Sequence, residues 1–440
     1  MEGTTGGAGK GPLEPETPTA PVHFRVPGII KRNMTLFALS QAFTGAGMSF
    51  AYGFGPLMVV GLTGSAALAG LTVALLGFSR FLVAYPVGKI TDTYGRKPGI
   101  MLGLVLALVG AIGMGLSMIV SSIFVLIAAM LVFGMGMNAA QQLRVAATDM
   151  YLPNNRAQAL GYISLGSLAG LLLVPAMMTS GEQMAKWLGQ HPLALPWFLM
   201  VGIIVFGMVL VYFVRPDPKV IGMNLQHYYP GYEPPKRKVV LAAAFRPIEL
   251  LQQPRTRLAI VSNCAGQGNM AIVMVLTSLV LSHHGHTLPE IAFSHMFHSM
   301  GMFGFTVPFG RLSDRFGHYK VMLPGVAVAF AGAALVTFTY SYFLITLGTF
   351  LVGLGWAAAN VAATALIADK YETQERGRAI GVNESFAGGM AMAASIATGP
   401  LIEWGGLPAA GVCAILIALP PLLMFVGQVL TGVARAQPER

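Results

Sequence analysis

The sequence predicts an all-helical membrane protein whose twelve transmembrane helices form two related halves of six. Three observations predict this fold: an apolar composition, twelve apolar runs long enough to cross a bilayer, and motifs of the first half that recur in the second. A soluble chain carries charge on about a quarter of its residues. This chain has 10% charged and 55% hydrophobic residues, so most of its surface must face lipid.

The apolar runs follow one another with short polar loops between them. About 20 residues of helix span the hydrocarbon core, where only an internally hydrogen-bonded backbone is tolerated. The predicted helices cover 35–60, 66–88, 99–120, 122–149, 157–179, 196–214, 257–281, 289–311, 320–339, 343–368, 378–402 and 407–432. They divide the chain into a disordered cytoplasmic tail 1–28, a first bundle 29–214, a cytoplasmic linker 215–256, a second bundle 257–433 and a tail 434–440.

The basic residues predict the orientation, because Lys and Arg are retained on the cytoplasmic side of short loops. Of the 27 Lys and Arg, only Lys186, Arg80 and Arg144 lie elsewhere, which leaves 24 in segments that are cytoplasmic if both termini are. This distribution also explains the net charge of +10 without a nucleic-acid partner. We expect a multi-pass protein of the plasma membrane, or bacterial inner membrane, that is monomeric in the bilayer.

The two halves repeat in parallel. Residues 86–95, Pro-Val-Gly-Lys-Ile-Thr-Asp-Thr-Tyr-Gly, match residues 308–317, Pro-Phe-Gly-Arg-Leu-Ser-Asp-Arg-Phe-Gly. Asp149, one helix pair later, recurs as Asp369. Both matches fall at the ends of the second and fourth helices of their halves, so each half has the same orientation in the membrane.

The pattern Gly88-x-x-x-Asp92-x-x-Gly95-Arg96-Lys97, in the loop after the second helix, resembles the signature of the major facilitator superfamily. The resemblance implies secondary transport by alternating access, with a site near the bilayer midplane between the halves. It also implies that Asp92 faces the positive end of the eleventh helix and that Arg96 pairs with Asp149. These residues would form a gating latch, closed when the protein faces outward; alternatively, the basic residues only set the orientation.

The second half keeps the same positions, Gly310, Asp314, Gly317 and Asp369, but has His318 where the first half has Arg96. We therefore expect its latch to be weaker or absent. The fourth and fifth helices also lack the arginine before Gly134 and the Gly-Pro-x-x-Gly-Gly pattern of the drug:proton antiporter branch, so typical drug antiport of that branch is not favoured.

Charged groups at membrane depth are expensive, so each is a functional candidate. Glu384 is the one acid well inside a predicted helix, and Arg80 is placed at a similar depth on the second helix. An Arg80–Glu384 pair could form and break during transport, or Glu384 could take a proton when the pair separates. Alternatively, the pair is permanent and structural, or Arg80 only binds backbone carbonyls. Arg144 on the fourth helix could bind an anionic group of the substrate, or reach to the interface or to backbone carbonyls.

Uncharged polar residues on the helices that line the family's cavity are weaker candidates for substrate binding. Hydrogen bonding between helices is the commoner use of such groups. They are Gln141, Asn138, Gln41, Asn263, Gln267 and Asn360.

The remaining histidines give little indication of a site. His295 and His298 on the eighth helix could titrate near neutral pH, although a satisfied interior histidine is the simpler reading. His283, His284 and His286 lack a carboxylate or cysteine that would complete a metal site. We expect no metal and no cofactor.

The sequence thus favours a secondary transporter of a small organic solute, driven by protons, with export slightly ahead of uptake or facilitated diffusion of an anionic metabolite. A Walker-type ATP-binding loop does not occur, so ATP is not expected to drive transport directly. A membrane sensor or assembly factor on the same scaffold is the rival from another class. No enzyme is predicted, because no nucleophile–base or metal-ligand constellation lies at one depth.

Overall fold

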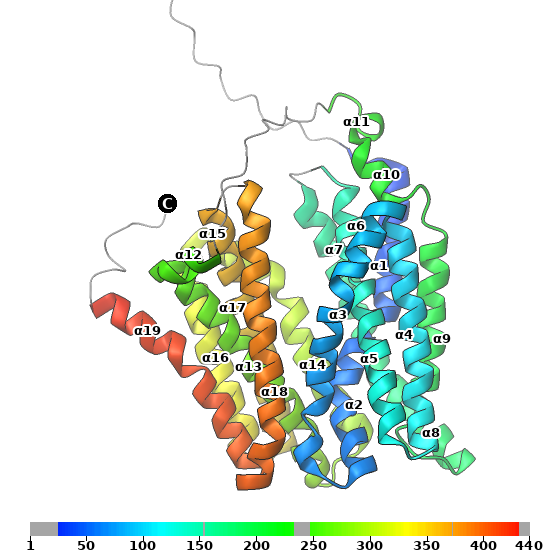
Figure 1. The fold of residues 1–440 in the computed structure, drawn as a ribbon, viewed down its shortest axis with the longest axis vertical. Coiled ribbons are helices and arrows are strands. Elements are labelled where there is room, and N and C mark those ends of the chain that lie inside the picture. Colours follow the sequence, from blue (N-terminus) through cyan, green and yellow to red (C-terminus); the bar gives the residue numbers. More distant parts are fainter. Residues whose placement is uncertain (1–24, 153–154, 233–246, 372, 431–440) are drawn as a thin grey trace, which may run out of the picture.

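The computed structural model describes residues 25–152, 155–232, 247–371 and 373–430, which form two helical bundles side by side (Figure 1). The first bundle contains α1 (Gly28–Thr44), α2 (Ala46–Thr63), η1 (Ala66–Leu68), α3 (Leu71–Tyr94), α4 (Arg96–Ile119), α5 (Ile123–Ala140), α6 (Gln142–Asp149), α7 (Arg156–Leu171), α8 (Leu173–Leu188) and α9 (Leu195–Tyr212). The linker contributes α10 (Pro218–Met223), α11 (Leu225–Tyr228) and α12 (Pro247–Gln252).

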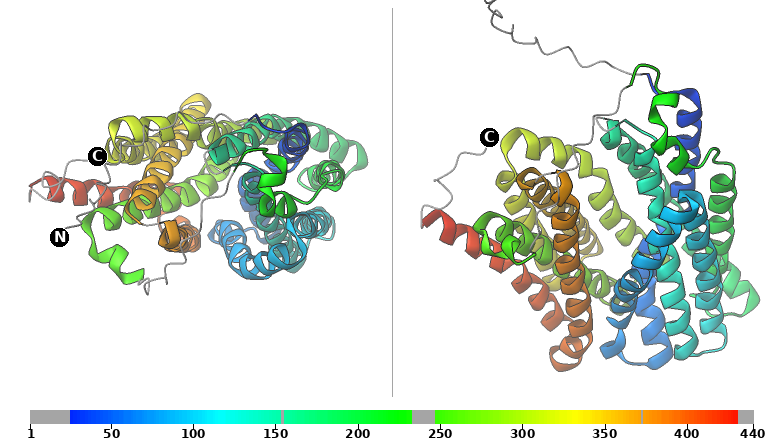
Figure 2. Two further views of the ribbon diagram at one scale, coloured as in Figure 1. Left: turned by 90° about the horizontal axis from the view of Figure 1, so that it is seen from above. Right: turned by 45° about the horizontal axis from the view of Figure 1, so that its top comes forward.

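The second bundle repeats the pattern of the first. It contains α13 (Pro254–His283), α14 (Leu288–Gly304), α15 (Thr306–Phe316), α16 (Tyr319–Phe338), α17 (Tyr342–Lys370), α18 (Thr373–Ile417) and α19 (Leu419–Leu430). Viewed from above, the two bundles lie next to each other, with α14 and α18 of one facing the other (Figure 2).

Twelve membrane crossings are confirmed once broken and merged helices are considered. Ten helical spans of the described part are long and apolar enough to cross a membrane. One of them, Ala379–Leu430, reverses at Gly406, whose φ of 72° only glycine adopts easily, and so makes two crossings. The remaining crossing is formed by α14 followed by α15, which are separated by the non-helical Phe305, so that neither helix alone spans the bilayer.

The helices extend beyond several predicted limits. The first crossing begins at Gly28 rather than at 35, and the fifth continues to Leu188, so that Lys186 lies in a helical turn, not in a loop. Polar turns at helix ends explain these errors, because apolar length marks only the part in hydrocarbon. The predicted tails 1–28 and 434–440 lie almost wholly outside the described residues.

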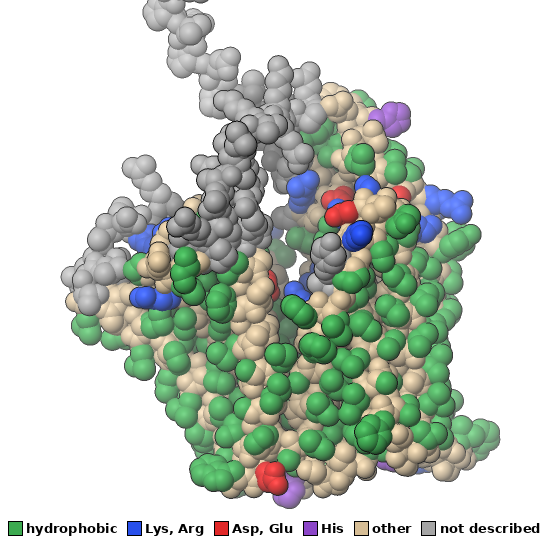
Figure 3. Space-filling model, in the orientation of Figure 1, with side chains coloured by type: hydrophobic (Ala, Val, Ile, Leu, Met, Phe, Trp, Pro, Cys, Tyr) green, Lys and Arg blue, Asp and Glu red, His purple; other side chains and the backbone are tan. Residues whose placement is uncertain are grey.

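The two ends of the molecule differ. The linker helices α10, α11 and α12 lie at one end, hereafter the linker end, while the turns that follow α2 and α8 lie at the other, hereafter the far end (Figure 1). The space-filling view shows the surface hollowed between the bundles toward the linker end, with acidic and basic side chains inside (Figure 3). The protein is therefore open at the linker end.

The bundles meet closely at the far end. A Cβ on Gly399 of α18 would lie 1.4 Å from the carbonyl oxygen of Ala67, and one on Gly70 would lie 1.8 Å from that of Ser395. Backbone therefore touches backbone here, which requires glycine at both positions. This contact closes the far end while the linker end stands open.

Candidate functional site

An acidic cluster with amide neighbours lies on the second bundle. Oε1 of Glu384, on α18, is 3.4 Å from the Nδ2 atoms of both Asn263 (α13) and Asn360 (α17), and 3.5 Å from that of Asn383. Asn360 also donates to Oδ1 of Asn263 at 3.0 Å. Three helices thus position one half-buried carboxylate among carboxamides, without a cation within ion-pair distance in the described chain.

A basic cluster lies on the first bundle. Arg80 of α3 and Arg144 of α6 are near enough to interact electrostatically, and neither has a carboxylate within 4 Å among the described residues. The Arg144 guanidinium lies 5.8 Å from the ring centre of Phe303, on α14 of the other bundle. Two unneutralised cations at membrane depth would attract an anionic group, since each is costly to keep there alone.

The Arg80–Glu384 ion pair considered from the sequence is not formed in this structure. Glu384 contacts carboxamides, whereas Arg80 is exposed and lies near Arg144 and Tyr52. The membrane depth inferred from the sequence could not show whether the two side chains pair, because it does not give the distance between the two bundles. Because the pair is absent when the linker end is open, Arg80 and Glu384 do not form a permanent structural pair.

Two of the polar candidates hold helices together instead. Asn138 donates to the Gly134 carbonyl at 2.8 Å and to Ser79 Oγ of α3 at 3.3 Å, and Gln41 donates to Ser167 Oγ of α7 at 3.1 Å. Gln141 and Gln267 are partly exposed. Asn263 and Asn360 therefore join Glu384, while Asn138 and Gln41 are used for packing.

The ion pair that the resemblance implies at the foot of the fourth helix is present. Nε of Arg96 lies 2.7 Å from Oδ2 of Asp149, and its Nη1 lies 3.1 Å from Oδ1 of Asp92. The Asp92 side chain is 75% exposed, and the side chains at 373–378 of α18 lie outside the described residues. The gating role of these residues stays a prediction.

Sequence reasoning missed Asp217, which completes this cluster. Its Oδ1 accepts the backbone N–H of Arg96 at 3.0 Å, and its Oδ2 accepts that of Lys97 at 2.9 Å. The carboxylate thus caps the N-terminus of α4, where free N–H groups and the helix dipole favour an anion. The signal was an aspartate between two prolines, Pro216 and Pro218, directly after the sixth crossing.

The glycines of the motif differ in what they do. Gly95 has a φ of 111°, and a Cβ there would lie 2.7 Å from Asp217 Oδ2, so the turn requires glycine. Gly88 has open space where a Cβ would be, so no close helix approach requires glycine there in this conformation. In the second half Gly317 has a φ of 93°, and Gly310 has only Val361 within 4 Å.

The second half retains a counterpart of the Arg96–Asp149 contact. Nε2 of His318 lies 3.0 Å from Oδ2 of Asp369, and its Nδ1 lies 2.7 Å from Ser313 Oγ. Asp314 is exposed. The contact is therefore present, since an imidazole bonded to Ser313 reaches the same carboxylate. Of the two expected alternatives, weaker or absent, the second does not hold for the contact, and its gating role stays a prediction.

Comparisons with known proteins identify the family. A sequence model of the Major Facilitator Superfamily matches residues 37–227 and 258–439. The chain belongs to this superfamily. It is accordingly an integral, multi-pass membrane protein of a transporter family.

Relatives within the Major Facilitator Superfamily cover most of the chain. The uncharacterized MFS-type transporter YdeG of Bacillus subtilis is 29% identical over 80% of this chain and 81% of its own length. The riboflavin transporter RfnT of Brucella anthropi is 25% identical over 86% and 90%. The nucleoside transporter NupG shares the fold, with a TM-score of 0.66, 12% identity and coverage of 92% and 98%.

Proposed function

We propose that this protein is a proton-coupled secondary transporter that exports a small organic solute bearing a negative group, by alternating access. The observation that carries the proposal is the pair of clusters, Glu384 among carboxamides and Arg80 with Arg144, on different bundles and each without a counter-ion in the described residues. Such groups can bind a substrate and a proton in the cleft, since their charges are not already neutralised.

The basic cluster suits an anionic end of the solute. Arginine binds carboxylate and phosphate groups through two parallel N–H donors, which fixes orientation as well as charge. Phe303, 5.8 Å from Arg144, places an aromatic face from the other bundle beside the same charge. A bound anion would therefore be held by groups of both bundles, and its binding would favour their closure around it.

Glu384 suits proton coupling. Its carboxylate is half-buried, and closure of the linker end would remove the remaining water from it. An ionised carboxylate without a cation is costly in a dry site, so the protonated form is favoured there. A proton that binds Glu384 in one conformation and leaves it in the other would then be exchanged for solute. The membrane proposed for this exchange is the inner membrane of a bacterium.

The test uses purified protein in liposomes with and without an imposed pH gradient. Glu384→Gln should keep exchange of labelled solute between equal pools but lose gradient-driven accumulation, because Gln resembles the protonated carboxyl. The matched control is Glu403→Gln, which removes an exposed acid at the far end of the same helix. Full accumulation by Glu384→Gln would assign Glu384 a structural role. A chain that binds solute yet exchanges none would favour a sensor.

A second candidate solute comes from the likeness to RfnT, named as a riboflavin transporter and 25% identical over most of both chains. A flavin presents donors and acceptors on a planar ring, which the amides of Asn263, Asn360 and Asn383 could match. Labelled riboflavin, with an anionic flavin phosphate beside it, is therefore the first pair of solutes to measure. If neither solute is transported, the flavin candidate is wrong, and other small organic anions are then screened.

A further inference from the structure

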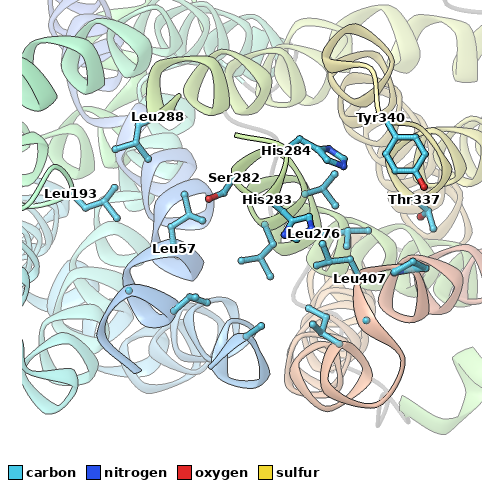
Figure 4. Close-up of a pocket in the computed structure, with 18 of the residues that line it drawn as sticks. Leu57, Leu193, Leu276, Ser282, His283, His284, Leu288, Thr337, Tyr340 and Leu407 are labelled. Atoms are coloured by element: carbon cyan, nitrogen blue, oxygen red, sulfur yellow. The ribbon is translucent and has the colours of Figure 1, made fainter. Parts of the chain in front are cut away.

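A vestibule opens at the far end, on the opposite side of the closed contact from the cleft. It encloses about 1060 Å³ between the bundles and is lined by α2 on one side and by α13 and α18 on the other (Figure 4). Its polar lining includes His283, His284 and Ser282 at the end of α13 (Figure 4). Burial lowers the pKa of His191, in the loop that completes the first-bundle side, so this residue stays neutral near pH 7.

The floor of the vestibule is a hydrogen-bonded chain that joins the bundles. Ser278 Oγ of α13 lies 2.5 Å from the Gly53 carbonyl oxygen of α2 and 2.7 Å from Nε2 of His295 on α14. Leu57 and Ser282, which line the vestibule, lie one helical turn beyond Gly53 and Ser278. The hydrogen bonds among Gly53, Ser278 and His295 therefore lie one helical turn from the vestibule.

The side chains around these hydrogen bonds are packed tightly and buried from water. A Cβ on Gly53 would lie 2.8 Å from Cδ2 of His295, and both His295 and His298 are buried, with exposed fractions of 0% and 1%. Close by, Ser49 of α2 and Ser299 of α14 make a second hydrogen bond between the bundles at 2.8 Å. His295 can therefore meet water only when α2 moves away from α13 and α14.

The partners fix the tautomer of both imidazoles. Ser278 has one proton, which it gives to the Gly53 carbonyl, so Nε2 of His295 must carry the proton that Ser278 accepts. His298 donates through Nδ1 to the carbonyl of Thr349 at 2.8 Å. Nδ1 of His295 and Nε2 of His298 are thus unprotonated, buried and without a hydrogen-bond partner. Two basic nitrogens one turn apart are left free.

No charged group is placed to compensate a proton here. Within the described residues, neither histidine forms an ion pair, and the group that acts on His295 electrostatically is His298. Glu182 of α8 is paired with Lys186, and Glu290 caps its own helix. The helices packed against α14 also carry Tyr52 on α2, Tyr162 on α7, Cys264 and His283 on α13, and Tyr342 on α17. Their other charged side chains lie toward the linker end of these helices: Arg156, Arg255, Arg257, Arg311, Asp314, Arg315, Asp369 and Lys370.

We propose that His295 and His298 form a proton-binding site of the far-end gate, which consists of the Ser278–Gly53 and Ser49–Ser299 hydrogen bonds between the bundles. A proton reaches this site from the vestibule when the Ser278–Gly53 bond opens. A protonated His295 in the closed gate would bury a charge and a second N–H without an acceptor, which is costly. The proton must therefore return to the vestibule before the gate closes. Acid on the far side holds the gate open, whichever solute is carried and whether or not Glu384 couples transport.

The experiment measures the gate without any solute. Cysteines replace Gly61 and Thr339, which line opposite sides of the vestibule, in a chain carrying Cys264→Ala and Cys413→Ala. Spin labels on them report the width of the vestibule in lipid nanodiscs. If only the open gate binds the proton, near pH 6.5, the ratio of open to closed molecules should rise roughly 30-fold between about pH 8 and pH 5.

Variants decide whether His295 is responsible. His295→Gln keeps a donor to Ser278 but cannot titrate, so the ratio should lose its pH dependence; His295→Asn makes the same test if the Gln variant does not fold. His284→Gln, an exposed histidine of the same vestibule, should titrate like the parent. Gly53→Ala should open the gate even at about pH 8. A pH-independent parent, a pH-dependent His295→Gln or a closed Gly53→Ala overturns the proposal.

Discussion

Nε2 of His318 lies 3.0 Å from Oδ2 of Asp369, where the first bundle has Nε of Arg96 at 2.7 Å from Oδ2 of Asp149. The duplicated halves thus keep the same contact with different cations. They differ in exposure, since the Asp149 side chain is 24% exposed and that of Asp369 is 72% exposed. The permanent charge of Arg96 beside the less exposed carboxylate should contribute more than an imidazole paired with a carboxylate that faces water.

Asp149→Asn should therefore lower transport more than Asp369→Asn. The first change leaves Arg96 with the exposed Asp92 as its ion-pair partner, whereas the second removes a contact that is worth at most about 1 kcal/mol at such exposure. Initial transport rates in liposomes, normalised to folded protein, measure both. Equal losses would mean that the two latches work symmetrically.

Replacement of Asp217 should destabilise the linker end. Asp217→Ala removes the acceptor of the Arg96 and Lys97 backbone N–H groups, which should cost about 1–2 kcal/mol and lower the apparent Tm by a few degrees. Asp217→Asn is the matched control, because it keeps an acceptor oxygen at the helix N-terminus. Thermal unfolding in detergent checks the difference; identical Tm values for Ala and wild type would show that water replaces the cap.

Gly399→Ala should prevent the bundles from closing at the far end, since its Cβ would lie 1.4 Å from the Ala67 oxygen. The control on the same helix is Gly389→Ala, where a Cβ meets nothing within 4 Å. With the vestibule labels described above, Gly399→Ala should shift the distances toward the wide state and Gly389→Ala should leave them unchanged. A narrow vestibule in Gly399→Ala would contradict the close backbone contact.

Loss of either unpaired arginine should weaken solute binding more than it weakens the fold. Arg144→Ala and Arg80→Ala each remove a cation without a carboxylate partner in the described structure, so no buried acid is left alone. A lost charged hydrogen bond of about 1.5–3 kcal/mol corresponds to a KM increase of roughly 10- to 100-fold. Arg156→Ala, exposed at the start of α7, is the control. Unchanged KM values would place the solute elsewhere.

The orientation can be checked with single cysteines in the background without native thiols. Asn224→Cys, in the linker between α10 and α11, should react with an impermeant thiol reagent only from the cytoplasm, and Lys186→Cys only from outside. Both positions are exposed, so access depends on the side of the membrane alone. External labelling at Asn224→Cys would reverse the proposed topology.

The number of crossings and the division into two halves follow from the sequence, whereas the Arg96–Asp149 pairing is what the family resemblance implies. The crossings and the halves depend on local signals, namely apolar length, basic loops and a motif that recurs in the repeat. Arg96 and Asp149 lie on different helices, so no local signal joins them. The limits of the crossings were less certain, because the polar ends of helices such as the last turn before Leu188 carry no apolar signal.

Which charged and polar groups contact one another depends on the arrangement of the two bundles in space. Arg80 and Glu384 are separate because the bundles stand apart at the linker end, and His295 meets Ser278 and Gly53 because three helices from two bundles converge at the far end. Neither relationship is encoded in spacing along one helix. Each depends on the relative position of two bundles, and that position changes with the conformation while the sequence stays the same.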